Sequence, residues 1–493
     1  MFDFIKKHKI PIIIVLVIII AAAVYFSINR SKTANLLNED VFNEFAESIE
    51  SRYSLNEGFE DQAALRDFIT SWADSRGLEY KTDDAGNIIF NMKAVERKKN
   101  LSASVVFVSY NYETAAANAK LLASAAAIAD TSLDSSRKTV IFVNDEKNSG
   151  SGYKSVNKKY IKGKSKVIYM DYGSSSYISA SSFGFTRSYV TVPYNKKEKV
   201  TCDTAVRVHI SGISPGEVGT GISKQPSPVS ALSSLLTRLQ SRSTVYQLAD
   251  LSIGTDGRMY PVSLDATFVL NSYSVASFTK YIDNRIKAWE KNYAEDHPEL
   301  SYTYEVIDDE EELPEKAYSS KASSSLANVL YTIQNGTYKY QSNDEIPEGR
   351  KEGDLCGINC ITGIRTKDGN FYIDLTTQAY NEAYMNRITG DNEAASELFG
   401  CTYTIKSETP RFVNDKDSLY RTFTSTYSKI SSGAGSGSSL KEEMDNYFTP
   451  CSYLDAKNSE ADIIHLRLND RSVTTLTNTI LIYMESKGNI LSF

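Results

Sequence analysis

Carboxylate side chains follow two apolar segments in the middle of this 493-residue chain. Residues 139–143 lead into Asp145 and Glu146, and residues 166–170 lead into Asp171. Both segments are rich in β-branched residues and are typical of buried strands. Because open α/β sheets place functional groups at the carboxyl ends of their strands, we expect these carboxylates at one edge of a sheet. Carboxylates placed there can bind a divalent metal ion or take a proton from a metal-bound water.

The order of elements around these carboxylates indicates an α/β domain. Residues 38–51 and 61–76 carry apolar residues at helical spacing and predict two amphipathic helices. A strand at residues 104–109, an alanine-rich helix at 114–130 and the strand at 139–143 predict a right-handed parallel crossover. From about residue 189, alternating strands and long helices predict a second domain inserted into the first.

The strand ends resemble those of the aminoacyl-histidine dipeptidases, a branch of the di-zinc exopeptidases in which one strand ends in Asp-Glu-Glu and the next in Asp. The triplet in this chain is Asp145-Glu146-Lys147. A helix, Gly-Leu-Glu, a turn and Gly-Asn-Ile-Ile over residues 61–89 also resemble the opening of that family. The resemblance implies an α/β/α sandwich with a mixed, largely parallel sheet and an inserted α+β lid domain. It also implies zinc-dependent dipeptidase activity and a homodimer formed through the lid.

Most positions that bind metal in that family carry other residues in this chain. A zinc pair needs about five nitrogen or oxygen ligands and a glutamate as general base. The family's His-x-Asp motif falls on Tyr110 and Tyr112, and its bridging aspartate falls near Ala117. Tyrosine is a poor zinc ligand at neutral pH because its hydroxyl loses a proton only at about pH 10. The family's last histidine ligand falls on residues 472–475, which contain no histidine.

Two acidic positions of the family site are retained. Glu146 matches the general base and Asp171 matches a metal ligand, whereas Lys147 replaces the adjacent metal-binding glutamate and would repel a zinc ion. One hypothesis is that Lys147 takes the place of the metal's charge by pairing with Asp171 and Glu146; the other is that it points into solvent. We therefore expect no metal, a vestigial general base at Glu146, and vestigial metal positions at Tyr110, Tyr112, Ala117, Lys147 and Asp171.

Two residues of the inserted domain are candidates for ligand binding. Arg258 falls where the family has a substrate-holding asparagine, and its guanidinium could bind the carboxylate of a peptide. The segment Gly357-Ile358-Asn359 resembles a Ser-x-Asn segment of the family, which makes Asn359 the second candidate.

One apolar, nearly uncharged segment occupies residues 10–28. Its length matches the roughly 20 residues that cross a hydrocarbon core of about 30 Å. Three lysines precede it, so the positive-inside rule favours a cytoplasmic tail at residues 1–9 and an extracytoplasmic body. A cleaved signal peptide is the alternative, because the segment contains three consecutive alanines. The expected organisation is a transmembrane helix at 10–28, a peptidase-like domain at 29–188 and 408–493, and a lid at 189–407.

Composition excludes one class of partner and leaves three functions open. A net charge of −7 with interspersed signs gives no basis for nucleic-acid binding. We expect a pseudopeptidase anchored in the cell membrane that binds a short peptide or cell-wall peptide, or supports assembly, at the cell envelope. The alternatives are an active dipeptidase or aminopeptidase with an atypical zinc site, and a structural scaffold for a membrane partner. No cofactor is expected unless the zinc-dependent alternative holds.

Overall fold

The structure, a computed structural model, describes residues 35–486 apart from 56, 93–103, 134–136, 147–149, 151, 217, 220–221, 223, 255–258, 347–349, 434–440 and 443–448. The predicted transmembrane segment at residues 10–28, Lys147 and Arg258 lie outside these residues. Among the described helices, none combines the length and the apolar character needed to cross a membrane.

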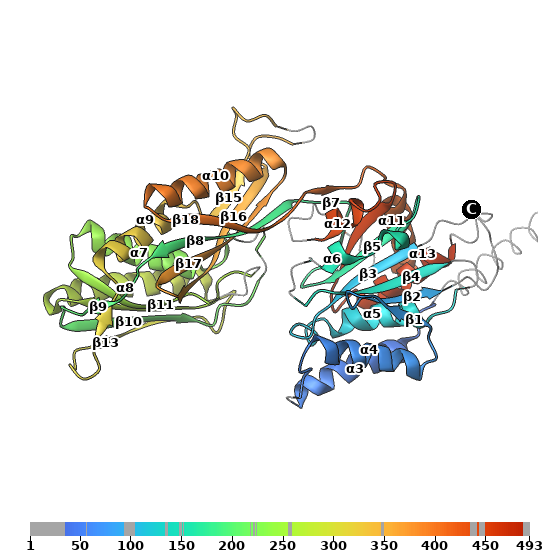
Figure 1. Ribbon diagram of the computed structural model, residues 1–493, viewed down its shortest axis with the longest axis horizontal. Coiled ribbons are helices and arrows are strands. Elements are labelled where there is room, and N and C mark those ends of the chain that lie inside the picture. The colour runs from blue at the N-terminus through green and yellow to red at the C-terminus, as the bar shows by residue number, and fades with distance from the viewer. Residues whose placement is uncertain are drawn as a thin grey trace, which may run out of the picture. The chain divides into compact units, whose positions relative to one another are not determined.

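The chain forms two compact units, and the second is inserted into the sequence of the first (Figure 1). Ser182–Phe412 makes up the second unit, and the described residues before and after it make up the first. The sequence predicts these boundaries at residues 189 and 407. The first observed boundary, at Ser182, comes earlier than predicted. The reason is that β8 (Gly184–Pro193) pairs along its whole length with β17 (Asn370–Ala379), a strand of the second unit.

Two amphipathic helices open the first unit, as the spacing of apolar residues predicts. At the start of α3 (Glu39–Ser54) and α4 (Gln62–Ser75), the side chains of Asn38 and Asp61 accept hydrogen bonds from backbone amides of the first turn. Such caps satisfy amide groups that have no partner inside the helix. The buried faces of the two helices meet where Phe45 packs edge-on against Trp72, with 5.0 Å between ring centroids.

The central sheet of the first unit has eight strands in the order β1-β2-β4-β3-β5-β21-β6-β20. These are β1 (Tyr80–Thr82), β2 (Ile88–Met92), β3 (Ser104–Tyr110), β4 (Lys138–Asn144), β5 (Lys166–Tyr172), β6 (Tyr177–Ser179), β20 (Lys441–Glu442) and β21 (Asp462–Leu468). The four central strands β4, β3, β5 and β21 run parallel, and β2 and β6 are antiparallel to their neighbours in this group. α5 (Ala119–Asp130) connects β3 to β4 as the predicted crossover. The mixed, largely parallel α/β sheet predicted from the sequence is confirmed.

Helices cover both faces of this sheet. Val106 and Val108 of β3 enter a core built with α3, α4, α5, α11 (Ser418–Gly433) and α13 (Val473–Ser486); the first three of these helices lie below the sheet in Figure 1. Phe107, the residue between them, points to the opposite face and packs against Tyr153 of α6 (Gly152–Ser155), which contacts α12 (Cys451–Asp455). Alternate residues of one strand therefore fill two separate cores, as expected for a sheet buried on both sides.

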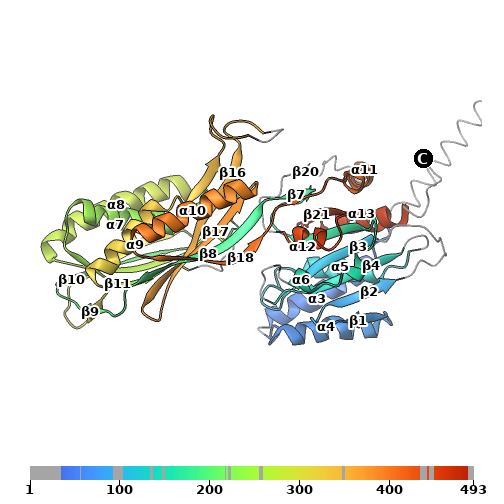
Figure 2. The ribbon, with the colours of Figure 1, turned by 45° about the horizontal axis from the view of Figure 1, so that its top comes forward.

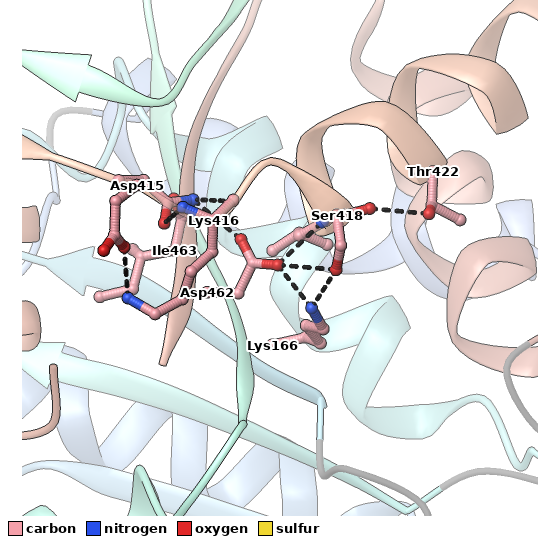
Figure 3. Close-up of polar contacts among 9 residues, drawn as sticks. Lys166, Asp415, Lys416, Ser418, Thr422, Asp462 and Ile463 are labelled. Atoms are coloured by element: carbon pink, nitrogen blue, oxygen red, sulfur yellow. Dashed lines mark hydrogen bonds and ion pairs between the residues drawn. The ribbon is translucent and has the colours of Figure 1, made fainter. Parts of the chain in front are cut away.

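A buried carboxylate joins three elements of the first unit at the starts of β5 and β21 (Figure 3). Oδ2 of Asp462 accepts hydrogen bonds from the Ser418 hydroxyl at 3.0 Å, from the Leu419 amide at 2.9 Å and from the Lys166 ammonium. Its Oδ1 accepts from the side-chain amide of Asn414 at 2.8 Å. Burial alone would raise the pKa of Asp462, but these donors outweigh burial and lower it. Asp462 thus connects β5, β21 and the N-terminus of α11.

The second unit contains two main sheets. The four-stranded sheet has the order β11-β12-β10-β13, and the five-stranded sheet has the order β15-β16-β17-β8-β18. The remaining bounds are β10 (Thr204–Ser211), β11 (Tyr246–Ser252), β12 (Leu264–Leu270), β13 (Ser301–Ile307), β15 (Gly336–Lys339), β16 (Leu355–Lys367) and β18 (Thr402–Thr409). Two short pairs complete the strands: β9 (Glu198–Lys199) with β14 (Lys316–Ala317), and β7 (Ser181–Ser182) with β19 (Phe412–Val413).

Four longer helices pack with these sheets: α7 (Pro228–Ser241), α8 (Ser272–Tyr293), α9 (Ser320–Thr332) and α10 (Glu382–Leu398). They occupy the part of the chain coloured green to orange in Figures 1 and 2. The leucine stripe of α7 is buried in a core shared with Val206 and Val208 of β10 and Phe278 of α8. An isolated backbone bridge between Ile253 and Ile364 connects the strands of the two sheets.

Candidate functional site

The carboxyl ends of the parallel strands of the first unit bring the predicted site positions to one edge of the sheet. β3 ends at Tyr110, opposite Asn144 at the end of β4, and Asp171 near the end of β5 is in register with Arg467 of β21. The sequence therefore predicts correctly which strand ends meet. The contacts that each side chain makes at this edge decide what chemistry it can perform.

Tyr110 is buried and committed to a structural hydrogen bond. Its side chain is 1% exposed, and its hydroxyl donates to the backbone carbonyl of Gly86 at 2.6 Å. Burial raises the pKa of Tyr110 well above its ordinary value, so the phenolate that a metal ion would need is disfavoured further. Gly86 has a φ of +82°, and a methyl group added to it would lie 2.9 Å from the side-chain amide nitrogen of Asn144, so this turn requires glycine.

Asn111 fixes the two loops that follow β3 and β4. Its side-chain amide donates to the backbone carbonyls of Asp145 and Glu146 at 3.0 and 2.8 Å. Its side-chain oxygen accepts from the backbone amides of Glu113 and Thr114 at 2.8 and 3.1 Å. Both the nitrogen and the oxygen of the Asn111 side chain therefore form hydrogen bonds to the backbone of the protein itself. Sequence reasoning missed Asn111, because it is only the middle residue of the altered motif.

Gln62, the first residue of α4, connects the same strand ends. Its side-chain amide donates to the Tyr110 carbonyl at 2.9 Å and to the Asn144 side-chain oxygen at 2.8 Å, and its oxygen accepts from the Tyr112 amide at 3.0 Å. Sequence reasoning did not identify Gln62, because an isolated glutamine at a helix start gives no signal of its own. Together with Asn111 it fills the edge with amide-to-backbone hydrogen bonds.

The two acidic residues after β4 differ in exposure. Asp145 is buried, and its carboxylate accepts a hydrogen bond from the backbone amide of Gly150 at 2.8 Å. Glu146, the predicted vestigial general base, is exposed. Lys147 lies outside the described residues, so its pairing with Asp171 and Glu146 stays a prediction.

Asp171 has a cationic neighbour that sequence reasoning missed. Its Oδ2 lies 3.8 Å from the Arg467 guanidinium and 3.8 Å from Nε2 of His465. The Arg467 side chain is 6% exposed, and its guanidinium also donates to the Tyr172 carbonyl at 3.4 Å. The guanidinium occupies the space beside Gly173, where a methyl group would come within 2.2 Å of Nε. An arginine between two leucines near the end of β21 (Asp462–Leu468) was the available signal.

His465 lies inside the protein next to Asp171. It is buried between the rings of Tyr169 and Tyr177, with centroid distances of 4.9 and 5.5 Å. The chain has four histidines, and none of them falls on a ligand position of the family in sequence. The fold nevertheless brings His465 next to Asp171, as a packed ring beside a carboxylate that Arg467 also approaches.

Tyr112 and Ala117, the remaining positions predicted to be vestigial metal positions, offer no ligand set. The Tyr112 hydroxyl donates to the neighbouring Glu113 carboxylate at 3.3 Å, and that negative charge raises the pKa of Tyr112. Ala117 is exposed on the turn before α5 and has no donor atom. Across the residues that the structure describes, no group of three or more His, Cys, Asp or Glu side chains is arranged to hold a metal ion. The donor set does not fit a zinc pair.

Asn359, the second ligand-binding candidate, is part of a buried network in the second unit. Its amide donates to the Gln334 carbonyl at 3.0 Å and to the Asn392 side chain at 2.9 Å, and its oxygen accepts from Thr377 at 2.8 Å. The residue is fully buried in the described structure. These bonds give Asn359 a structural role, because β16 is buried along most of its length. Its contact with a ligand stays a prediction.

No family model matches the sequence, and no curated protein matches it. Solved structures do match the fold. The aminoacylhistidine dipeptidase of Vibrio alginolyticus aligns with a TM-score of 0.60 at 13% identity, covering 91% of this chain and 97% of that one. A tripeptidase of Staphylococcus aureus aligns at 0.49 and 8%, and the aminopeptidase PepT of Bacillus cereus at 0.47 and 10%, each over 92% of this chain. The chain therefore has a fold similar to that of the dipeptidase.

Proposed function

We propose that this chain is a membrane-anchored protein with a dipeptidase-like fold that binds peptides at the cell envelope and does not hydrolyse them. The proposal rests on the hydrogen bonds at the edge of the sheet where the parallel strands of the first unit end. The Tyr110 hydroxyl, the Asn111 amide and the Gln62 amide make hydrogen bonds to backbone or side-chain atoms of the protein itself. An exopeptidase of the di-zinc type needs that edge to present free nitrogen and oxygen ligands.

The charge arrangement supports the same conclusion. A di-zinc site brings several positive charges next to its carboxylates, and the acidic ligands stabilise them. Here the retained Asp171 already lies near the buried cation Arg467. A zinc ion bound to Asp171 would come close to the guanidinium, and like charges repel strongly away from bulk water. Arg467 thus offers Asp171 the stabilisation that a metal would otherwise give.

Membrane anchoring rests on residues 10–28 alone. Their length, apolar character and flanking lysines favour an uncleaved anchor with an extracytoplasmic body. Protease digestion of intact cells and of inside-out vesicles tests this orientation. We expect the protease to digest the body when it reaches the extracytoplasmic face of the membrane in intact cells. In inside-out vesicles the body should stay undigested. Digestion only in inside-out vesicles would refute the orientation.

An active metallo-dipeptidase is the second candidate, because the fold matches a dipeptidase and because Glu146 and Asp171 are retained. Metal analysis of the full-length chain purified in detergent, combined with a dipeptide hydrolysis assay, separates the two candidates. We expect substoichiometric zinc and no turnover that a chelator abolishes. Stoichiometric zinc with chelator-sensitive turnover would refute the proposal.

Peptide binding separates a binding protein from a pure scaffold. Calorimetric titration of the full-length chain with short peptides should give saturable binding that Arg258→Ala weakens, because Arg258 is the candidate for contact with a carboxylate. Arg365→Ala is a suitable control, since Arg365 makes its ion pair with Asp374 within the protein. Absence of binding by every peptide, with normal folding, would favour the scaffold.

A further inference from the structure

A lysine-rich segment, residues 154–166, precedes and enters β5 in the first unit. It contains six lysines, and the longer stretch 147–170 contains no aspartate or glutamate. This concentration of positive charge contrasts with the net charge of −7 of the whole chain. Four lysines of the segment are exposed and, in the described part of the chain, have no carboxylate within ion-pair distance: Lys158, Lys159, Lys162 and Lys164. Lys166 differs, because it pairs with Asp462.

Hydrogen bonds hold the lysine-rich segment on the first unit. The side-chain amide of Asn458 donates to the carbonyls of Ile161 and Gly163 at 3.1 and 2.7 Å. The backbone amide of Asp462, the first residue of β21, donates to the Ser165 carbonyl at 2.9 Å. The exposed lysines therefore extend from a backbone that is fixed to the segment preceding β21, and they lie within seven consecutive residues.

Neighbouring residues add to the positive charge. The ammonium group of Lys457 donates to the Lys154 carbonyl at 2.8 Å, and the ammonium group of Lys154 lies 4.7 Å from the ring centroid of Tyr453. Two acidic residues, Asp455 and Glu460, belong to the same neighbouring stretch. Within the described structure, neither forms an ion pair with a lysine of the segment. The surface thus keeps an excess of positive charge.

The composition of the segment indicates the kind of partner. A patch of one sign that the protein does not neutralise attracts polyanions. Arginine is the preferred residue for paired hydrogen bonds to individual phosphates in nucleic acids, and residues 147–170 contain no arginine. Lysine is a hydrated point charge, and clusters of such charges next to a membrane segment are attracted to anionic lipids.

The short connection to the predicted membrane segment supports a lipid partner. Six residues separate residue 28 from Asn35, where the described part of the first unit begins. Even fully extended, a chain of that length spans only about 20 Å. If residues 10–28 are anchored, the first unit therefore stays at the membrane surface. Such tethering makes a weak second contact effective, because the contact becomes intramolecular.

We propose that the lysine-rich segment binds the anionic headgroups of the membrane in which the chain is anchored. This inference rests on the membrane anchoring proposed above and adds a second attachment, which orients the first unit on the bilayer. Each lysine near an anionic surface favours the contact by roughly fivefold. The contact involves none of the strand-end residues, so it is independent of whether the chain hydrolyses peptides.

Lysine labelling of the full-length chain in lipid vesicles tests this contact. A membrane-impermeant acetylating reagent is added to vesicles of phosphatidylcholine alone or mixed with phosphatidylglycerol, and mass spectrometry gives the labelling rate of each lysine. We expect Lys154, Lys158 and Lys162 to be labelled several-fold more slowly in the anionic vesicles, relative to the exposed Lys339 and Lys367 of the second unit. At about 1 M salt the Debye length is only about 3 Å, so this difference should disappear.

Two variants with equal losses of charge separate the segment from other lysines. The test variant removes the four exposed lysines of the segment: K158Q, K159Q, K162Q and K164Q. The control variant removes four exposed lysines of the second unit: K280Q, K287Q, K291Q and K321Q. Protection of Lys154 in anionic vesicles should be lost in the test variant and kept in the control. Circular dichroism checks that both variants are folded.

The possible results distinguish the partner from the anchor. Equal labelling of the segment in the two kinds of vesicle, or protection that persists in the test variant, would overturn the lipid contact. Protection by single-stranded DNA added to neutral vesicles, without protection by anionic lipid, would overturn it in favour of a nucleic-acid partner. Alkaline carbonate extraction from neutral vesicles tests the anchor by itself: release of the chain would contradict the proposed anchoring, whatever the labelling shows.

Discussion

Replacing Asp462 by asparagine should destabilise the first unit strongly. The carboxylate receives four hydrogen bonds, from Lys166, Ser418, Asn414 and the amide of Leu419 (Figure 3). Asparagine keeps one acceptor oxygen but presents an NH2 group where donors now point. The Lys166 side chain, 16% exposed, would keep its charge without a carboxylate.

The size of the effect follows from burial. Removing one partner of a buried ion pair costs about 3–5 kcal/mol, mostly because the other charge stays buried and unpaired. We therefore expect Asp462→Asn to lower the free energy of unfolding of the first unit by about 3–5 kcal/mol. The lowered pKa of Asp462 adds a pH signature. The stabilisation is complete above the ordinary carboxyl pKa and is lost as the pH falls below it, toward the lowered folded-state pKa.

Tryptophan fluorescence during urea unfolding can follow each unit separately. The chain has two tryptophans, Trp72 in the first unit and Trp289 in the second. A Trp289→Phe background leaves Trp72 to report on the first unit, and a Trp72→Phe background gives the converse. Asp462→Asn should shift the Trp72 transition to lower urea concentration and leave the Trp289 transition in place.

Asp415→Asn is the matched control. Asp415 also lies just before α11 in sequence, but it is exposed and pairs only with the neighbouring Lys416 in the described structure (Figure 3). Its replacement should leave the unfolding midpoint unchanged. A destabilisation by Asp462→Asn of less than about 1 kcal/mol would show that the pair contributes no more than an exposed one, and would refute the role assigned to it.

Three further changes test other parts of the structure. Burial lowers the pKa of Lys138 to about 7. Between this pH and the ordinary pKa of lysine, the unfolded chain therefore binds a proton that the folded chain does not, and the free energy of unfolding should rise with pH. Lys138→Met should remove this rise, which urea unfolding at several pH values measures. Tyr110→Phe leaves the buried carbonyl of Gly86 without its donor and should cost about 1–3 kcal/mol in the Trp72 transition; no change would contradict the structural role of the hydroxyl. Asn359→Ala leaves several buried partners without a hydrogen bond and should lower the free energy of unfolding in the Trp289 transition by about 2–4 kcal/mol. An unchanged midpoint with altered peptide affinity would instead support ligand binding by Asn359.

Local patterns in the sequence were sufficient to predict the strand ends of the first unit. The apolar runs before Asp145 and Asp171 are strands, and the alanine-rich segment between β3 and β4 forms the crossover helix. The parallel arrangement then brings Tyr110 to the same edge. These features depend on periodicity and on the handedness of connections, both of which act over short stretches of chain.

The partner of Asp171 could not be predicted in this way. Arg467 lies almost 300 positions later in the sequence, and it meets Asp171 only because β21 pairs with β5 in one register. A shift of one residue would turn Arg467 to the other face of the sheet. The burial of Asn359 could not be predicted for a related reason, since a short motif does not reveal whether its side chain is enclosed by α10. Both cases depend on long-range packing.

The position of β21 between β5 and β6 affects how the protein is made on the ribosome. The edge of β5 that pairs with β21 has no partner strand until the ribosome has synthesised the roughly 230 residues from Ser182 to Phe412 and the segment beyond them. About 300 residues separate the end of β5 from the end of β21, and at typical translation rates of about 5–20 residues per second their synthesis lasts roughly 15–60 s. The nascent first unit therefore exposes an apolar strand edge for that time, and it should depend on chaperones more than the contiguous second unit does.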